Sequence, residues 1–434
     1  MNRFFSLALL GCLLTPLGAS AQQNAGDSVL NHTRAGRLSV GGYGEVAMTR
    51  NFFSDNQYKY RNPQKYKDDP SNGQFDIPHA VVYLGYNFGK GWSMGTEIEF
   101  EHTGTGVSKE IEADEGGEYE NEVEKGGEVE LEQFWLQKTF SRAANVRVGH
   151  IVVPVGLNNA HHEPLNFFTV YRPEGENTLL PSTWHDTGIS FFGRAGQFRY
   201  ELQVVAGLDA FRFSRDKWAR NAAGSAYEFK PANKYGVAAR IDNYTVPGLR
   251  MAVSGYFGRA MHNTYPNERE GEGKTYDKTK GNVAIGAFDF TYDRHNWVVR
   301  GNVDYGTLSD AATISKLKIN TPSASPYDHS YVGKAAIACG MEAGYDLFSQ
   351  VPRLRADEQR LYVFGRYEYY NSYIKEDSEP TYDYTARHRM AVGVNYFPVK
   401  QIAVKAEFSK RFLKSGYNNE PSVSIGVAYE GFFL

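Results

Sequence analysis

The stretch "WSMGTEIEFEH", residues 92–102, carries the clearest two-residue alternation in this 434-residue chain. Its side chains alternate between a mainly apolar face and a face that carries three carboxylates. The first face holds Trp92, Met94, Thr96, Ile98 and Phe100, and the second holds Ser93, Gly95, Glu97, Glu99 and Glu101. A period of two residues predicts a β-strand. A soluble sandwich and a membrane barrel both produce such a strand, so this segment alone leaves the two open.

The spacing of the other segments favours the barrel. We expect sixteen strands, at 38–49, 75–88, 91–103, 128–140, 145–153, 187–193, 197–208, 234–242, 248–260, 281–293, 296–307, 331–346, 360–371, 386–397, 400–412 and 421–433. Short and long connections alternate between them along the chain. Outer-membrane barrels sort their connections in this way, with short periplasmic turns and long extracellular loops. The sequence therefore predicts an all-β fold, a transmembrane antiparallel β-barrel of 16 strands.

The two faces of the expected strands agree with this prediction. The faces that we assign to lipid include Phe198, Tyr200, Leu202 and Val204, as well as Ile402, Val404, Ala406 and Phe408. A charge facing lipid at mid-bilayer costs about 2–4 kcal/mol, so we assign the alternate residues, such as Arg199, Glu201, Lys405 and Glu407, to the lumen. Backbone groups left unpaired in lipid are also costly, which requires the sheet to close on itself. Sixteen strands closed in this way leave a lumen wide enough for water.

The N-terminus predicts export. Arg3, the apolar run from Phe4 to Leu14 and the small residues Ala19 to Ala21 are typical of a signal peptide over 1–21. We expect a short periplasmic segment at 22–36, the barrel over 37–434 and a location in the outer membrane. Cys339 is then the only cysteine, which leaves no intrachain disulfide. The net charge of −3 is too small to predict a nucleic-acid partner.

Two further stretches carry a resemblance to a known family. "VRVGHIVVPVGLNN" (146–159) ends an expected strand with Gly149, Pro154 and Gly156, and "LLPSTWHDTGISFFG" (179–193) opens the next with Asp186, Thr187 and Gly188. Together with "GRLSVGGYGEVAMT" (36–49), this order resembles the phosphate-selective porin O and P family. The resemblance implies a usually trimeric, 16-stranded porin whose third extracellular loop folds into the lumen. It also implies a phosphate preference set by arginine and lysine side chains along the pore.

The expected third loop contains the first group of candidate site residues. We expect six of its polar side chains to face the water path at a constriction, namely His161, His162, Glu163, Arg172, Glu174 and Glu176. The same residues could simply solvate a loop that lies over the mouth. A metal site at His161 and His162 would need ligands from other segments. A catalytic site would need a nucleophile oriented by a base, for which the loop offers no known context.

Basic residues form the second candidate group. The two-residue alternation of the expected strands can place nine of them on the inner face, namely Arg147, Arg199, Arg240, Arg250, Arg300, Arg366, Arg389, Lys405 and Arg411. Rings of basic side chains favour anions. Alternatively, these residues pair with nearby carboxylates such as Glu201, Asp242, Asp304, Glu368 and Glu407 and brace the wall.

Residues 97–132 argue against a simple phosphate preference. They contain 14 acidic residues against Lys109 and Lys125. Glu97, Glu99 and Glu101 would lie on a strand next to the strand of Glu128, Glu130 and Glu132, and like charges opposite each other are destabilising. A bound Ca²⁺ ion would offset them, since hard cations take oxygen ligands, but a solvated acidic loop explains the composition as well. We expect no other cofactor.

These observations predict an outer-membrane porin for the passive diffusion of small hydrophilic solutes or anions, in contact with the lipid bilayer and assembled as a homotrimer. The alternatives are a sugar-selective porin, a general porin without phosphate preference, and a structural barrel with a plugged lumen. An enzyme is not expected, because the sequence offers no Ser/His pair on the predicted lipid-facing wall.

Overall fold

The computed structural model describes residues 38–109, 123–181, 183–225, 229–263, 273–320 and 329–434, and its strands form one antiparallel sheet. The signal peptide and periplasmic segment expected at 1–36 lie outside these residues. The strands are β1 (Leu38–Asn51), β2 (Asn72–Asp76), β3 (Ala80–Gly89), β4 (Trp92–Lys109), β5 (Val123–Ser141), β6 (Ala144–Val152), β7 (His185–Ala195), β8 (Phe198–Ala206), β9 (Tyr235–Asn243), β10 (Leu249–Arg259), β11 (Asn282–Arg294), β12 (Trp297–Leu308), β13 (Ala335–Asp346), β14 (Arg360–Ile374), β15 (Ala386–Val399), β16 (Ile402–Phe412) and β17 (Glu420–Phe432).

The sheet closes into a barrel of sixteen staves. Its first and last strands, β1 and β17, pair in antiparallel register from Gly41 opposite Phe432 to Asn51 opposite Ser422. The described residues form seventeen strands because β2 and β3 pair with successive parts of β1 and together occupy one of the sixteen strand positions of the barrel. Pro78, which has no backbone N–H to donate, lies in the break between them. The 16-stranded barrel predicted from the sequence is confirmed, except that the strand expected at 75–88 is interrupted.

Inner and outer faces follow the predicted alternation. Leu202 and Val404 are 50% and 44% exposed on the outside, whereas Arg199 and Lys405 are 3% and 2% exposed. Apolar side chains therefore dominate the outer face, and the charged side chains of the strands lie mainly on the inner face. This is the pattern of a barrel that has lipid outside.

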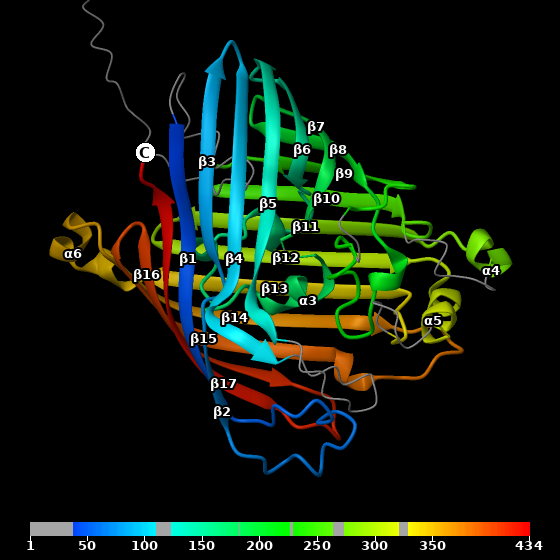
Figure 1. Cartoon of the computed structure of the whole chain (residues 1–434). Coiled ribbons are helices and arrows are strands. Elements are labelled where there is room, and N and C mark those ends of the chain that lie inside the picture. The colour runs from blue at the N-terminus through cyan, green and yellow to red at the C-terminus, as the bar shows by residue number, and fades with distance from the viewer. Residues whose placement is uncertain (1–37, 110–122, 182, 226–228, 264–272, 321–328) are drawn as a thin grey trace, which may run out of the picture.

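The short helices lie at the two ends of the barrel or in the third loop. Figure 1 shows α4 (Gly273–Lys278) and α5 (Ala311–Ile319), which belong to long connections, at the end opposite α6 (Pro352–Ala356). The 3-10 turns η2 (Ala210–Arg212), η4 (Leu347–Gln350) and η5 (Asp383–Thr385) also lie in connections. Among the described residues, each helix is too short or too polar to cross a membrane.

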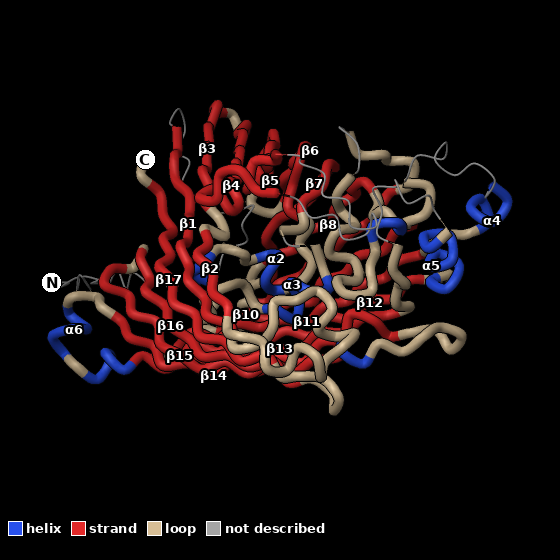
Figure 2. Tube along the Cα trace, turned by 60° about the horizontal axis from the view of Figure 1, so that its bottom comes forward, coloured by secondary structure: helices blue, strands red, loops and turns tan. Residues whose placement is uncertain are grey.

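The hydrophobic core lies inside the barrel, where the third loop, residues 153–184, crosses the lumen. Figure 2 shows two helices of this loop, α2 (Leu157–Ala160) and α3 (Glu174–Leu179), within the ring of strands. Val153, Trp184 and Leu179 of the loop belong to one buried apolar cluster with inward side chains of the wall, including Trp135 and Tyr256. The fourth loop adds Phe211 and Trp218 to the same cluster. The prediction that the third loop folds into the lumen is confirmed.

Candidate functional site: the third loop and the wall it contacts

The third loop enters the lumen through a tight turn that glycine makes feasible. Gly156 has φ +88°, a left-handed conformation that side chains with a Cβ rarely adopt. A Cβ at this position would also lie 2.2 Å from Glu176 Oε1. The Glu176 carboxylate accepts hydrogen bonds from the backbone N–H groups of Leu157 (3.1 Å), Asn158 (2.9 Å) and Asn159 (3.0 Å). Gly156 and Glu176 together fix the start of α2. This explains why the stretch 146–159 has a glycine at position 156.

Lys405 of β16 holds the middle of the loop from the opposite wall. Its ammonium group donates to the backbone carbonyls of Pro164 (2.6 Å), Phe167 (2.9 Å) and Thr169 (3.0 Å). The 3-10 turn η1 (Pro164–Asn166) lies in this segment. Glu407, two residues along the same strand, accepts the N–H of Val170 at 3.0 Å. A buried cation and a buried anion of one strand therefore satisfy backbone groups of the loop, which water cannot reach here.

Glu174 connects α3 to the far wall. Its carboxylate lies 3.2 Å from Arg389 Nε and 2.6 Å from Arg411 Nε. The next backbone N–H, that of Gly175, donates to Glu368 Oε1 at 2.9 Å. Burial alone would raise the pKa of Glu174, but the positive charges of Arg411 and Arg389 outweigh it and hold that pKa at about 2. Glu174 is thus an ionised anchor of the loop at neutral pH.

The remaining predicted loop residues are packed into the loop and its contacts. His161, His162 and Glu163 are each 1% exposed, and Glu163 accepts a hydrogen bond from Asn166 at 2.8 Å. Arg172 is 7% exposed and donates to Tyr43 Oη at 3.2 Å and to the carbonyl of His162 at 3.3 Å. These side chains position the loop against the wall.

The predicted basic wall lies on the inner face of the barrel and is closely paired. Arg199 and Arg240 pair with Glu201 (2.7 Å) and Asp242 (3.0 Å), and Arg250 lies 2.7 Å from Asp289. The other ion pairs join Arg300 and Arg366 to Glu342, Arg366 and Arg389 to Glu368, Arg389 to Glu407, and Arg411 to Glu174 and Glu420. Arg147 instead donates to Gln137 Oε1 at 3.0 Å and lies over the Trp135 ring. Asp304, expected as a partner, accepts a hydrogen bond from Asn302 at 2.5 Å.

The acidic wall is formed by the neighbouring strands β4 and β5. Glu99 lies opposite Glu130 and Glu101 opposite Glu128, so the predicted register of like charges is confirmed for these two pairs. Residues 110–122 of the acidic loop, and the side chains from 103 to 128, lie outside the described part of the chain. Near this wall, His79 Nδ1 lies 2.5 Å from Glu99 Oε1, a contact that the sequence reasoning missed.

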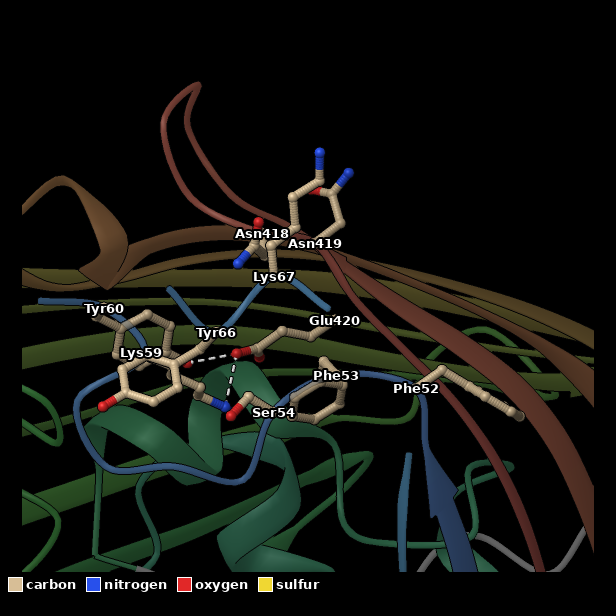
Figure 3. Close-up of a pocket in the computed structure, with 10 residues that line it drawn as sticks. All are labelled: Phe52, Phe53, Ser54, Lys59, Tyr60, Tyr66, Lys67, Asn418, Asn419 and Glu420. Atoms are coloured by element: carbon tan, nitrogen blue, oxygen red, sulfur yellow. Dashed lines mark hydrogen bonds and ion pairs between the residues drawn. The ribbon is translucent and has the colours of Figure 1, made fainter. Parts of the chain in front are cut away.

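A separate pocket opens between the first and last long loops. Phe53, Lys59, Tyr66 and Asn418 are among the residues that line it. Its volume is about 350 Å³, part of which is open to solvent. Figure 3 shows Lys59 and Tyr60 turned toward Glu420. Lys59 Nζ and Tyr60 Oη lie 2.8 Å and 2.7 Å from Glu420 Oε1. These contacts join the first loop to the start of β17.

Comparisons with known proteins agree with this geometry at the level of the fold. No protein-family profile matches the sequence. An uncharacterized protein of Aquifex aeolicus is 27% identical over 391 residues, which are 88% of this chain and 78% of the relative.

Solved structures that share the fold include an anion-selective porin from Comamonas acidovorans, with a TM-score of 0.52 and 8% identity over 91% of this chain and 99% of the porin. OmpF of Salmonella typhi, solved in complex with daunomycin, has a TM-score of 0.51 and 10% identity over 91% and 97% of the two chains. The channel DcaP of Acinetobacter baumannii has a TM-score of 0.50 and 11% identity over the same shares. The chain therefore has the porin fold.

Proposed function

We propose that this protein is an outer-membrane porin through which small hydrophilic solutes diffuse passively, with the third loop as its constriction. The observation that carries the proposal is the closed sheet with apolar side chains outside, charged side chains inside and one long loop crossing the lumen. A barrel that encloses polar side chains and excludes lipid provides a route for water-soluble molecules. The porin fold supports a channel over an enzyme.

The pairing of the basic wall supports a porin without phosphate preference. Along β8–β11, three arginines face three carboxylates, those of Glu201, Asp242 and Asp289. Basic side chains that are already engaged with carboxylates offer little net field to a passing anion. The wall at β4 and β5 contributes further buried acidic side chains, Glu97, Glu99 and Glu132. We therefore favour the general porin over the phosphate-preferring channel that the family resemblance implies.

A barrel without conductance is the second candidate. The buried apolar cluster, which includes Trp135, Trp184, Phe211 and Trp218, occupies part of the lumen and favours this alternative. A structural or adhesive barrel would keep such a plug permanently. The charged inner face favours the channel, because a permanently dry interior would be stabilised equally well by apolar side chains.

The location in the outer membrane, the contact with its lipid bilayer, the signal peptide at 1–21 and the homotrimer are parts of the same proposal. The exposed apolar outer face supports the lipid contact. Trimer formation follows from the family resemblance, and cross-linking of the detergent-solubilised protein tests it directly.

Reversal potentials across planar bilayers test the proposed selectivity. We expect similar reversal potentials in gradients of potassium chloride and potassium phosphate, without a shift toward the phosphate equilibrium potential. Liposome swelling tests the alternative of a sugar-selective porin, since a general porin admits small sugars and small zwitterions at rates set by size. A strong phosphate selectivity, or block of the current by low concentrations of phosphate or an oligosaccharide, would contradict the proposal.

A further inference from the structure

Three acceptor groups from separate segments converge inside the barrel wall. Glu97 of β4, Glu132 of β5 and His162 of the third loop have side chains that are 0% exposed. His162 Nε2 lies 3.5 Å from Glu97 Oε1 and 4.0 Å from Glu132 Oε2. One ligand atom from each residue lies within 4.8 Å of the other two. This cluster belongs to no interaction described above.

The facing atoms of the cluster have no hydrogen-bond partner among the described residues. They are Glu97 Oε1, both carboxylate oxygens of Glu132 and His162 Nε2. Arg172, a nearby cation, is directed to Tyr43 and lies 3.9 Å from Glu99 Oε1. Buried carboxylates without donors carry a large desolvation cost, so a cation or a proton between them is required.

A bulge in β5 places Glu132 in the cluster. Glu97 lies opposite Gln133 and Ile98 lies opposite Leu131, so Glu132 is an extra residue in this pair of strands. Glu132 and Gln133 are both buried, whereas Leu131 and Phe134 on either side are each 48% exposed. A bulge re-aims a side chain in this manner, and here it brings a second carboxylate to the same point of the lumen as Glu97.

The ring of His162 has the orientation of a metal ligand. Its Nδ1 lies 3.1 Å from the carbonyl oxygen of Asn159, which can only accept, so Nδ1–H is the donor. In a neutral imidazole, Nε2 then presents a lone pair to the two carboxylates. A second-shell bond from one ring nitrogen to a backbone carbonyl is the usual arrangement in metal-ligating histidines. Gln133 Nε2 donates to Glu97 Oε2, the carboxylate oxygen that does not face His162.

We propose that Glu97, Glu132 and His162 bind one divalent first-row transition-metal ion of the Zn²⁺ type. Zn²⁺ takes imidazole nitrogen and carboxylate oxygen at about 2.0–2.2 Å, which places ligand atoms about 3.3–3.6 Å apart around a tetrahedral ion. The observed separation of 3.5 Å agrees with this spacing, and the one of 4.0 Å is slightly longer. Ca²⁺, which the acidic composition of 97–132 suggested, prefers six to eight oxygens, so the imidazole favours the transition metal.

The bound ion would tie the third loop to the β4–β5 wall. His162, the ligand from the loop, lies just after α2, whose start is fixed by Gly156 and Glu176. The ion would therefore add a second attachment at the same end of the loop. The neighbouring group of His79, Glu99 and Glu101 is a weaker candidate, because His79 Nδ1 already contacts Glu99 at 2.5 Å. The proposal does not depend on conductance.

Metal titration of the purified full-length protein in detergent micelles tests the site. After treatment with a chelator and its removal, we expect Zn²⁺ to bind with a stoichiometry of one ion per chain, and Co²⁺ to bind with absorption bands of a nitrogen- and oxygen-ligated ion. His162→Gln and Glu132→Gln should each weaken Zn²⁺ binding by at least about tenfold. His388→Gln is the matched control, because His388 Nδ1 lies 2.6 Å from Tyr367 Oη in an exposed contact, and the Zn²⁺ affinity of this variant at the proposed site should be unchanged.

Two results would overturn the proposal. One is a wild-type protein that binds no Zn²⁺ or Co²⁺ at micromolar concentrations, in which case a proton occupies the cluster. The other is Zn²⁺ binding that survives His162→Gln and Glu132→Gln unchanged. Should a variant fail to fold, as judged by its heat-dependent shift in gel mobility, the Co²⁺ spectrum and stoichiometry of the wild type still decide the question.

Discussion

The ammonium group of Lys405 on β16 lies 2.9 Å from the carbonyl oxygen of Phe167, a residue 238 positions earlier in the chain that belongs to the third loop. The same ammonium group also reaches the carbonyls of Pro164 and Thr169. One buried side chain thus holds three backbone groups of the loop in the middle of the lumen. Contacts of this kind fix the position of the third loop inside the barrel.

Lys405→Met should therefore loosen the loop. The substitution leaves three buried carbonyls without their donor, and we expect a loss of about 2–5 kcal/mol in the free energy of unfolding. Thermal unfolding in detergent measures this loss. Lys410→Met is the control, since Lys410 on the same strand lies over the Phe412 ring, away from the loop. Equal stability of the two variants would contradict the anchoring role.

Gly156→Ala should destabilise the protein through both conformation and contact. An alanine in the backbone conformation of Gly156, φ 88° and ψ 170°, costs on the order of 1–3 kcal/mol, and its Cβ would also displace the Glu176 carboxylate from the start of α2. Gly196→Ala separates the two effects, because Gly196 also has a positive φ, +58°, but no atom within 4 Å of the added Cβ. Gly156→Ala should have the lower melting temperature, and the reverse order would argue against the Glu176 contact.

The predicted and the observed structures agree most closely where a single strand carries the information. Trp92 is 48% exposed on the outer face of the barrel and Glu97 is buried on the inner face, and this alternation is visible in the sequence. The bulge at Glu132 left a fainter signal, two consecutive polar residues, Glu132 and Gln133, within an alternating strand.

The partners of the third loop could not be predicted from the sequence. Lys405 and Phe167, or Glu174 and Arg411, are brought together only by closure of the whole barrel. The two-residue alternation predicts that the basic residues lie on the inner face. It contains no information about which carboxylate each of them contacts. The short helices α2 and α3 were also not predicted. They are stabilised by contacts with the loop and the wall, and their sequences show no helical periodicity.

Removal of one carboxylate from the paired wall should alter ion selectivity. Glu368→Gln takes a negative charge away from Arg366 and Arg389, which lie 3.1 Å and 3.2 Å from it. The freed positive charge should shift the reversal potential toward greater anion permeability. Glu358→Gln is the control, because Glu358 pairs with Lys400 in an exposed turn. A shift of equal size in both variants would show that the wall pairs do not set selectivity.

Acid should release the Glu174 anchor. Its pKa of about 2 lies below the value near 4.3 of an unpaired glutamate, so ionised Glu174 stabilises the folded state above about pH 4.3. That stabilisation is lost as the pH falls from about 4.3 toward 2. The difference in unfolding free energy between wild type and Glu174→Gln should accordingly be constant near neutrality and shrink in acid.

Glu376→Gln provides the reference for this pH series. Glu376 forms an exposed pair with Lys334 at 3.6 Å, and exposed pairs contribute little to stability. Its unfolding free energy should stay close to that of the wild type throughout. A Glu174→Gln difference that persisted unchanged to pH 2 would mean that the carboxylate acts only as a neutral hydrogen-bonding group.

Single-channel current through the wild type and through a variant that lacks residues 160–176 tests the central claim most directly. Both proteins should insert into planar bilayers and conduct in discrete steps, and the deletion should give the larger conductance because it removes the segment that crosses the lumen. A folded wild type that never conducts, or a folded deletion variant with unchanged conductance, would contradict the account of a porin constricted by its third loop.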